Sequence, residues 1–537
     1  MDRIIYEETG WRLKRIISLL EVRDWEFQGV KKRTLVFDVE VEGDLSMPRL
    51  QLDKVNGFLW ISKNELPLFY ENRNYNERLM YEVCKKGLEM HNEPKKVIIL
   101  GSGPIRIGQG VEFDYLTVHA VQALQKKGIK AVIINNNPET VSTDYSTSDR
   151  LYFEPLTVDF VEKVVRNEKE GLLGVIAQFG GQTAVNLASG LEAKGIKLLG
   201  TSAAAINLAE DRQKTGEIVA QLGYRMPDWR TAWSRAEVLD KVAELNYPVL
   251  LRPSFVLGGE GMRIVHSRRE VEEYLQQYAP MFEQLVREDN DNLSKDLPNL
   301  DEFGQKTRVT YKKRFTKPLL IDQFIEDAIE VDIDFISDGE KTYCFILEQL
   351  DKAGIHSGDS ACVFPAQNLT KEIQDKLVQI TRDISRAFGV VGIGNLQCAI
   401  KNGEIFVLEV NPRASRTVPF VSKCLGFSLT ELATNVILGD KLPEFEFDLE
   451  YYKNPEYAWS LKQEVVYKEQ PIRKIKPKFV AIKWPVFCLE KLPGVSRNLG
   501  PLMKSTGEAM TVGKTFTEAY QKWVNPESLE EIRVYLV

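Results

Sequence analysis

Residues 390–413 constrain the fold of this chain more than any other stretch, because they carry two apolar runs around an Asn-Gly turn. The first run reads VVGIGNLQCAI (390–400), the turn is Lys401-Asn402-Gly403, and the second run reads EIFVLEVNPR (404–413). Asn-Gly between two such runs is typical of a β-hairpin, since both residues accept the positive φ of a tight turn. We therefore expect two antiparallel strands here.

Oxygen-bearing side chains interrupt these apolar strands. Glu409 and Asn411 are two residues apart, so the alternation of a strand places them on one face, and Gln397 is expected roughly opposite Glu409. Such an oxygen-rich cluster suits a hard cation, Mg²⁺ or Mn²⁺. Arg413 and Arg416 follow directly and could hold an anion. The alternative is an amphipathic hairpin with a solvated polar face.

The overall composition excludes some classes of function. The chain has 537 residues, of which 43% are apolar and 27% charged, so about two to four globular domains are expected. A net charge of −7 and a pI near 5.6 give no electrostatic case for nucleic acid or an anionic membrane. A mildly acidic chain can still bind nucleotides, because metal ions and local arginines neutralise the phosphates.

Cysteine usage and the N-terminal sequence bear on the compartment. The six cysteines show neither CxxC nor zinc-ligand spacing, so we expect reduced thiols, mostly in the core. The N-terminal stretch MDRIIYEETGWRLKRI lacks the apolar segment of a signal peptide, and no stretch is long and apolar enough to span a bilayer. The expected location is the cytoplasm.

Changes in pattern divide the chain into four predicted parts: residues 1–93, 94–207, 208–440 with an insert at 279–318, and 441–537. In the first part, Arg12 to Glu21 has helical spacing, residues 35–41 alternate as in a half-buried strand, and Asn76 to Met90 is a second predicted helix. No catalytic constellation is evident there. A small packing or docking domain of unknown role is expected.

Strands and helices alternate through residues 94–207. Apolar strands are predicted at 97–100, 131–134, 175–177 and 197–200, which indicates a parallel, doubly wound sheet of Rossmann-like type. A dinucleotide site is rejected for two reasons. Glycines 101, 103 and 108 do not follow the G-x-G-x-x-G spacing, and the second strand ends in three asparagines (135–137) where a ribose-binding acid is required.

Residues 208–440 contain a glycine-rich loop between two predicted strands. The loop PSFVLGGEGM (253–262) joins strands at 247–252 and 263–265, and no helix opens after it. This pattern predicts a flap whose backbone N–H groups lie over phosphates, and it does not fit a Walker loop. The alternative is a tight hairpin turn. Further strands are predicted at 319–325 and 330–335.

Three polar segments have no function assigned from their residues alone. The loop 354–360 contains His356, and a single loop histidine is more often structural or solvated than catalytic. Residues 279–318 are charge-mixed and are expected to be an inserted surface segment. The Lys-rich stretch 468–478 favours a solvated or docking face over a nucleic-acid site.

Long motifs follow one another between about residues 95 and 520, namely GSGPIRIGQGVEFDY (101–115), NNNPETVSTDYSTSDRLYFEPLT (135–157), QFGGQT (178–183), LGTSAAAINLAEDR (199–212), RPSFVLGGEGM (252–262), AGIHSGDSA (353–361) and EVNPRASRTVPFVSK (409–423). In this order they resemble the ATP-grasp superfamily, and within it the large subunit of carbamoyl phosphate synthetase. RIGQGVEFDY and NPETVSTDY favour its second, carbamate-phosphorylating half. The resemblance implies an α/β fold in which a Rossmann-like pre-ATP-grasp domain precedes an α+β ATP-grasp domain, and the last part (441–537) completes the synthetase unit.

The resemblance also implies roles for individual residues. The residues expected to contact the ATP phosphates are Arg212 and Arg252, with Gly258 and Gly259 forming the phosphate flap. Adenine and ribose are expected to be held by Gln323, Ile325 and Glu330, next to a further nucleotide-contacting loop of Gly354, Ile355, His356 and Ser357. The expected ligands of Mg²⁺ or Mn²⁺ (two ions per ATP site) are Gln397, Glu409 and Asn411, and Arg413 and Arg416 are expected to lie near the phosphoryl group and carbamate.

The implied activity is ATP-dependent phosphorylation of carbamate, feeding arginine and pyrimidine biosynthesis. Only one copy of RPS-x-x-x-GG and of E-x-NPR is present, and the regulatory domain that often follows the second half is expected to be absent. The implied partners are a separate first-half synthetase chain and a glutaminase subunit. A homodimer performing both phosphorylations, an ATP-grasp ligase for another carboxylate, and a non-catalytic scaffold remain alternatives.

Overall fold

The structure is a computed structural model that describes residues 94–253, 258–278, 318–443, 479–488 and 498–525, together with the strands at 12–27, 30–42, 283–287, 311–315, 446–447 and 474–475. The chain divides into two compact units, Met1–Pro94 and Lys95–Val537. No helix in the described ranges combines the length and apolar character that crossing a membrane requires.

The first unit contains an antiparallel pair, β1 (Arg12–Phe27) and β2 (Val30–Glu42). The predicted strand at 35–41 is confirmed, whereas the predicted helix from Arg12 to Glu21 is wrong. Apolar residues of β1 recur every third position (Leu13, Ile16, Leu19, Val22), and their partners in β2 every second position (Val41, Val39, Phe37, Leu35). A register shift after each pair reconciles the two spacings, so β-bulges imitate a helical period. The predicted helix at 76–90 lies outside the described residues.

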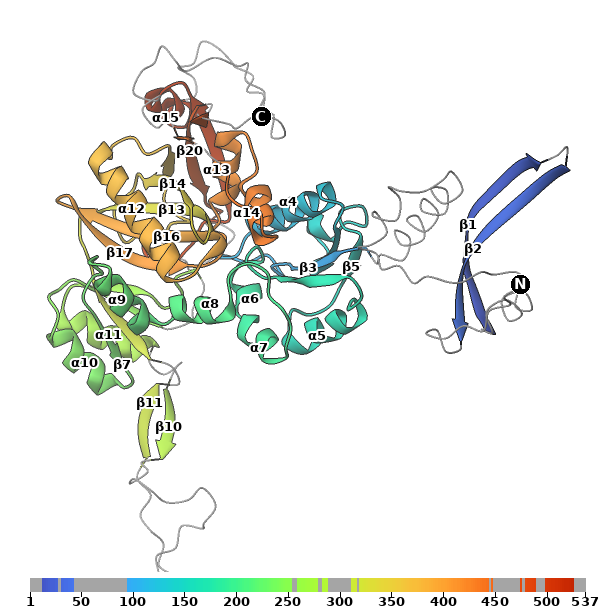
Figure 1. Cartoon of the computed structure of the whole chain (residues 1–537). Helices are drawn as coiled ribbons and strands as arrows, with labels where there is room; N and C mark the ends of the chain where they lie inside the picture. The colour runs from blue at the N-terminus through green and yellow to red at the C-terminus, as the bar shows by residue number, and fades with distance from the viewer. Residues whose placement is uncertain are drawn as a thin grey trace, which may run out of the picture. The chain divides into compact units, whose positions relative to one another are not determined.

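In the second unit, a parallel sheet is formed by β3 (Lys96–Leu100), β4 (Lys130–Ile134), β5 (Arg150–Tyr152) and β6 (Leu172–Ile176) in the order β5-β4-β3-β6. Helix α4 (Glu112–Lys126) covers one face, and α5 (Val158–Asn167) and α7 (Ala188–Ala193) cover the other (Figure 1). The predicted doubly wound sheet is confirmed. Residues 197–200 add only an isolated bridge between Leu198 and Val175.

Alternation along β3 explains why helices cover both faces of this sheet. Val97 and Ile99 pack into the cluster that contains α4, while Ile98 and Leu100 pack with α5 and α7. All four side chains are fully buried, as a central parallel strand requires. Shorter helices lead onward to the next sheets: α6 (Gly181–Val185), α8 (Ala203–Glu210) and α9 (Arg212–Gln221).

An antiparallel sheet of order β7-β12-β8-β9 follows, formed by β7 (Trp229–Ala232), β8 (Val249–Pro253), β9 (Arg263–Val265) and β12 (Leu319–Gln323). Helices α10 (Arg235–Ala243) and α11 (Arg268–Tyr278) share a separate hydrophobic cluster with it. The predicted strand–glycines–strand hairpin is confirmed, because β8 pairs antiparallel with β9. Within the predicted insert, β10 (Glu283–Arg287) and β11 (Tyr311–Phe315) form an antiparallel ribbon (Figure 1).

The largest sheet has the order β17-β16-β13-β14-β15-β20-β21 and is antiparallel throughout. Its strands are β13 (Ile329–Asp338), β14 (Thr342–Gln349), β15 (Cys362–Phe364), β16 (Val391–Lys401), β17 (Glu404–Asn411), β20 (Val480–Val486) and β21 (Gly507–Gly513). The remaining elements are α12 (Lys371–Ala387), α13 (Val418–Leu425), α14 (Leu429–Ile437), α15 (Phe516–Val524) and the short pair β18 (Glu446–Phe447) and β19 (Lys474–Ile475).

The hairpin predicted at 390–413 is confirmed as β16 and β17. Asn402 and Gly403 both have positive φ, 52° and 79°, as a tight primed turn requires. A single hydrophobic cluster joins the parallel sheet to the seven-stranded sheet, with Leu116 of α4, Phe420 of α13 and Val436 of α14 among its members. The buried cysteines Cys362, Cys398 and Cys424 carry free thiols.

Candidate functional site

A cavity of about 1060 Å³ is lined by residues of the β7-β12-β8-β9 sheet, of the seven-stranded sheet and of the loops around them. Its lining includes every residue proposed from the sequence: Arg212, Arg252, Gly258, Gly259, Gln323, Ile325, Glu330, Gly354, Ile355, His356, Ser357, Gln397, Glu409, Asn411, Arg413 and Arg416. The polar face of the β16–β17 hairpin therefore borders a cavity shared with the phosphate-side residues Arg212 and Arg252, which favours a binding site over the alternative of a merely solvated face.

Polar side chains form two rows across three adjacent strands of the large sheet. In the first row, Asp332 of β13 pairs with Gln397 of β16, which pairs with Glu409 of β17. The second row has the same order, Asp334, Asn395 and Asn411. The predicted position of Gln397 opposite Glu409 is confirmed. Directly opposite residues share a face of the sheet, so each row gathers its polar atoms within a few ångströms.

Hydrogen bonds orient the two amides of the predicted metal site. The Gln397 Nε2 donates to Asp332 Oδ1 at 2.9 Å, and the Asn411 Nδ2 donates to Asn395 Oδ1 at 3.5 Å. With their nitrogen atoms engaged, both amides leave an oxygen for another partner, and Glu409 adds a carboxylate. This donor set of hard oxygens fits Mg²⁺ or Mn²⁺.

The protein donors alone are few for a dedicated metal cage. In the ranges that the structure describes, no three His, Cys, Asp or Glu residues are grouped so as to hold a metal. Magnesium in nucleotide sites is ordinarily held by one or two carboxylates, water and substrate phosphates. The residues present therefore fit a cation that arrives with a nucleotide.

Two arginines share one carboxylate in the adjoining wall. Arg212 at the start of α9 forms an ion pair with Asp322 at 2.7 Å, and Arg252 of β8 lies 3.8 Å from the same carboxylate. The Arg212 Nε is buried without a hydrogen-bond partner. This cluster carries more positive than negative charge and an unused donor, which are the properties of a phosphate site.

The glycine flap rests on a loop from the C-terminal part of the chain. The backbone N–H of Met503 donates to the carbonyl oxygen of Gly258 at 2.8 Å. Gly259 has φ +74°, and a Cβ there would lie 1.9 Å from the carbonyl oxygen of Pro501. Only glycine therefore allows this approach of the two backbones.

Glu330 and Gly354 form a second wall. The Gly354 N–H donates to Glu330 Oε1 at 2.9 Å. Burial raises the pKa of Glu330 to about 7, an effect that nearby Asp332 reinforces and the bond from Gly354 opposes. Gly354 has φ +89° and faces the ring of Phe324, so a side chain at this position has no room.

Gln323 uses its side-chain amide to fix the neighbouring loop. Its Nε2 donates to the carbonyl oxygen of Pro248 at 3.2 Å, and its Oε1 accepts from the N–H of Asn246 at 3.2 Å. The segment from Gln323 to Ile325 is thereby held against the cavity wall.

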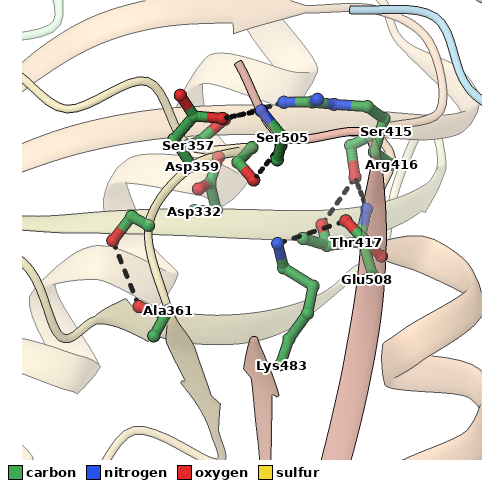
Figure 2. A network of polar contacts seen from close by, with 12 residues as sticks. Asp332, Ser357, Asp359, Ala361, Ser415, Arg416, Thr417, Lys483, Ser505 and Glu508 are labelled. Atoms are coloured by element: carbon green, nitrogen blue, oxygen red, sulfur yellow. Dashed lines mark hydrogen bonds and ion pairs between the residues drawn. The ribbon is translucent and has the colours of Figure 1, made fainter. Parts of the chain in front are cut away.

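His356 and Arg416 meet at the far side of the cavity. Burial, together with the charges of Arg416 and Lys483, lowers the pKa of His356 to about 3, so the imidazole is neutral near pH 7. Its Nδ1 accepts from the Gly358 N–H at 3.0 Å, which leaves the proton on Nε2. Arg416 donates to Ser357 Oγ at 3.3 Å, as Figure 2 shows.

Arg413 is held by the parallel-sheet domain. Its Nε donates to Gln182 Oε1 at 3.0 Å, and burial lowers its pKa, against which Glu409 and Glu210 act. The neighbouring backbone is fixed by Gln178, whose carbonyl accepts from the Ala414 N–H at 3.1 Å and whose Nε2 donates to the Pro412 carbonyl at 3.3 Å. The β6 end of the parallel sheet thus positions this arginine.

Among the charged residues that line the same cavity, the sequence analysis did not assign to the site Asp322, Lys483 and Glu508, nor Glu210, Asp211 and Asp332. Lys483 of β20 is 2% exposed and donates to Glu508 of β21 at 3.2 Å (Figure 2). Burial alone would lower the pKa of Lys483, but Cys362 and Glu508 outweigh it and the pKa is raised. Single charges within the apolar runs LLIDQFI and VAIKWPV were the available signal.

Two family descriptions match most of the second unit. The family described as carbamoyl phosphate synthase preATP-grasp domain matches residues 93–208. The family described as carbamoyl-phosphate synthase L chain, ATP binding domain matches residues 211–284 and 292–445. The second match covers the strands and loops that line most of the cavity.

Carbamoyl phosphate synthase large chains are similar to this chain over most of its length. The carbamoyl phosphate synthase large chain, C-terminal section, of Methanocaldococcus jannaschii is 47% identical over 80% of this chain and 63% of its own length. The carbamoyl phosphate synthase large chain of Clostridium beijerinckii is 43% identical over 80% of this chain, which spans 35% of that relative.

Two solved structures show the same fold at low identity. An N5-carboxyaminoimidazole ribonucleotide synthetase in complex with ADP has a TM-score of 0.53 at 13% identity, over 80% of this chain and 95% of its own. The biotin carboxylase domain of Hydrogenobacter thermophilus 2-oxoglutarate carboxylase has a TM-score of 0.53 at 15% identity, over 80% and 89%. Together with the sequence matches, these findings show that the chain belongs to the carbamoyl phosphate synthase large-chain family and has its parallel-sheet and ATP-grasp domains.

Proposed function

We propose that the cavity binds ATP with Mg²⁺ or Mn²⁺ and transfers the γ-phosphoryl group to carbamate, giving carbamoyl phosphate and ADP. One observation carries this proposal. A single cavity brings the oxygen donors Gln397, Glu409 and Asn411 together with the paired arginines Arg212 and Arg252. Cation ligands and phosphate ligands in one cavity are what phosphoryl transfer requires.

The reaction needs positioning and charge neutralisation more than covalent help. Gln397, Glu409 and Asn411 would hold the divalent cations, which would supply the positive charge that neutralises the nucleotide phosphates. Arg212 and Arg252 would bind the phosphate oxygens, with the free Nε of Arg212 as one donor. Arg413 and Arg416 would orient the carbamate and the transferred group. No side-chain nucleophile is assigned.

The opposite wall would hold the nucleoside. The segment from Gln323 to Ile325 borders the adenine position, and Glu330 accepts hydrogen bonds from the ribose hydroxyls. The loop of Gly354, Ile355, His356 and Ser357 completes this wall, with neutral His356 offering an N–H donor. The flap at Gly258 and Gly259 would close over the phosphates and exclude water, which protects the labile carbamate and its phosphate.

The chain would work as the second half of a split synthetase. The curated relatives extend beyond this chain, and the M. jannaschii relative is called a C-terminal section. We propose a separate first-half chain that supplies carbamate and a glutaminase subunit that supplies ammonia. The whole assembly would consume two ATP with bicarbonate and glutamine, and its product would enter arginine and pyrimidine biosynthesis.

The test is the reverse reaction, ATP formation from ADP and carbamoyl phosphate by the purified chain with Mg²⁺. We expect steady ATP formation, reduced at least 100-fold in Glu409→Gln, which removes the only carboxylate of the predicted ligand set. Gln125→Ala, at an exposed residue remote from the cavity, serves as the matched control. Absence of ATP formation in a chain that still binds nucleotide would overturn the assigned substrate.

A second assay separates the split enzyme from a self-sufficient one. The chain alone is supplied with bicarbonate, ammonia and ATP, and carbamoyl phosphate is trapped and measured. The split arrangement predicts no steady product without a first-half chain. Steady product from this chain alone would show that one sequence performs both phosphorylations.

A further inference from the structure

Two buried carboxylates of β13 lie in the same rows as the predicted metal ligands, and one of them, Asp332, also lines the cavity. Asp332 is 5% exposed and Asp334 is fully buried. Each heads one of the two polar rows across β13, β16 and β17. Burying a carboxylate is costly unless its hydrogen bonds are satisfied, and an apolar residue at such a position would serve the core better. Two such acids in alternate positions of one strand therefore need an explanation beyond packing.

Asp332 fixes the orientation of the Gln397 amide. Its Oδ1 accepts from Gln397 Nε2 at 2.9 Å, and its Oδ2 accepts from the Nε2 of Gln349. Both glutamines donate to this carboxyl group, so each turns its nitrogen atoms toward it. Gln349 does so although its own Oε1 stays buried without a partner. For Gln397 the consequence is an oxygen directed away from Asp332.

Asp334 organises the second row and the arginine segment together. It accepts from Ser415 Oγ at 2.6 Å, from Thr417 Oγ1 at 2.6 Å and from Asn395 Nδ2 at 3.0 Å. The Asn395 Oδ1 then accepts from Asn411 Nδ2 at 3.5 Å. One buried carboxylate thus fixes an amide relay to Asn411 and the backbone segment that carries Arg413 and Arg416.

We propose that Asp332 and Asp334 are positioning residues that hold the amides of Gln397 and Asn411 with their oxygen atoms presented to the divalent cation. This inference rests on the proposed function. It assigns to the two acids no contact with substrate. Partners that orient metal ligands in this way typically change metal affinity by about 10–100-fold when they are replaced.

The first test is the metal requirement of nucleotide binding. ADP binding to the full chain is measured by calorimetry at increasing Mg²⁺, and the Mg²⁺ concentration for half of the full effect is compared between variants. We expect Asp332→Leu to raise that concentration at least tenfold, because the Gln397 amide loses the acceptor that holds its nitrogen. The weak ADP binding without metal should stay within about twofold.

A double variant distinguishes positioning from mere structural support. In Asp332→Asn/Gln397→Glu the carboxylate and the amide exchange places, so the new amide donates to the new carboxylate and still accepts from Gln349. We expect the Mg²⁺ requirement to return to within about threefold of the original. If Asp332 only stabilised the fold, the second substitution would lower the melting temperature further and would not restore the Mg²⁺ requirement. Failure of this rescue, with both variants folded, would overturn the proposal for Asp332.

Controls separate stability from positioning. Gln349→Met removes the other bond to Asp332 without touching a ligand, and Ser385→Ala removes a buried bond to Thr342 elsewhere on the large sheet. Both should lower the melting temperature and leave the Mg²⁺ requirement unchanged. If Asp334→Asn does not fold, Asn395→Leu tests the same row, since it removes both the donor to Asp334 and the acceptor for Asn411 and predicts a similar rise.

Every outcome decides between the two proposals. If the unaltered chain binds ADP with no dependence on Mg²⁺, the proposed function fails at its metal site. If it depends on Mg²⁺ and the Asp332 and Asp334 variants depend on it equally, the proposed function stands and this inference is wrong.

Discussion

Two glycine-rich loops in this chain look alike as sequence and differ in what surrounds them. The loop after β3 (101–110) is packed against the protein over its first residues, since the Gly103 N–H donates to Asn135 Oδ1 at 3.0 Å and a Cβ on Gly101 would lie 2.5 Å from Asn135 Cγ, and only its later residues Gly108 and Gln109 contribute to the lining of the cavity. The loop between β8 and β9 borders a cavity of about 1060 Å³. Glycine permits close approach to protein in both loops, to Asn135 in the first and to the Pro501 backbone in the second, so glycine alone does not distinguish them.

Charge marks the difference between the loops. A neutral asparagine meets the first loop, whereas Arg212 and Arg252 share one carboxylate beside the second. The first loop lies at the switch point of a parallel sheet, where a ligand is often bound. Here that edge instead carries Gln178, which ties the parallel sheet to β16 and to the residues before Arg413. Free volume and uncompensated charge, more than glycines, identify a nucleotide site.

The largest expected effect separates the arginines near the two loops. Arg252→Met should weaken ADP binding in the presence of Mg²⁺ about 100-fold, because a charge-assisted bond to phosphate contributes about 1.5–3 kcal/mol. Arg106→Met, within the first loop, should change ADP affinity less than threefold. Calorimetry of both variants is the measurement. Equal losses would mean that the first loop also meets the nucleotide.

The next effect concerns stability. Gln178→Ala leaves the buried carbonyl oxygens of Ile393 and Pro412 without this donor, so the free energy of unfolding should fall by about 2 kcal/mol. Gln125→Ala, whose bonds are exposed, should change it by less than about 0.5 kcal/mol. Denaturant titration measures both. A large loss of ADP affinity in Gln178→Ala, with the free energy of unfolding unchanged, would contradict the assigned structural role.

Matched glycine substitutions give a smaller effect. Gly259→Ala combines positive φ with a clash against Pro501, and it should slow the ATP-forming reaction about tenfold by displacing the flap. Gly103 has nearly the same φ, but a Cβ there meets only ordinary contacts at 3.5 Å. Gly103→Ala should therefore cost about 1 kcal/mol of stability and leave the rate near its original value. Similar rates for the two variants would show that the flap does not close in the reaction.

The smallest effect is a pH dependence confined to the second loop's cavity. Because burial raises the pKa of Glu330 to about 7, this carboxyl is mostly protonated at pH 6 and mostly ionised at pH 8. The ionised form is the stronger acceptor for ribose hydroxyls, so ADP affinity should rise about threefold between these pH values. Glu330→Gln should remove this part of the pH profile. An unchanged profile would place the ribose elsewhere.

Much of the site could be predicted from the sequence, since the hairpin pattern placed Gln397 roughly opposite Glu409. Period-two alternation fixes which side chains share a face, but the register from the Asn-Gly turn alone would pair Gln397 with Leu408, and a β-bulge next to Cys398 shifts its partner to Glu409. The same reasoning failed at β1, where a bulge after every third residue imitates the helical period. Bulges depend on the partner strand, which local spacing does not reveal.

Residues brought together by distant strands escaped prediction for a related reason. Lys483 and Glu508 reach the cavity because β20 pairs with β15, more than 100 residues earlier in the chain. Asp322 gains its meaning only when Arg212 and Arg252 both approach it. A single charge in an apolar strand indicates that a partner exists, but only the order of the strands in the sheet shows which residue that partner is.

The hydrophobic cluster shared by α4, α13 and α14 has a practical consequence. The boundary near residue 208 separates two stretches of sequence, but it does not separate two independent cores, because one cluster extends across it. A fragment cut at this boundary would expose Phe420 and Val436 on a bare apolar surface and would tend to aggregate. By contrast, the β7-β12-β8-β9 sheet shares its own cluster with α10 and α11, so a cut on either side of this part would leave its apolar surface covered.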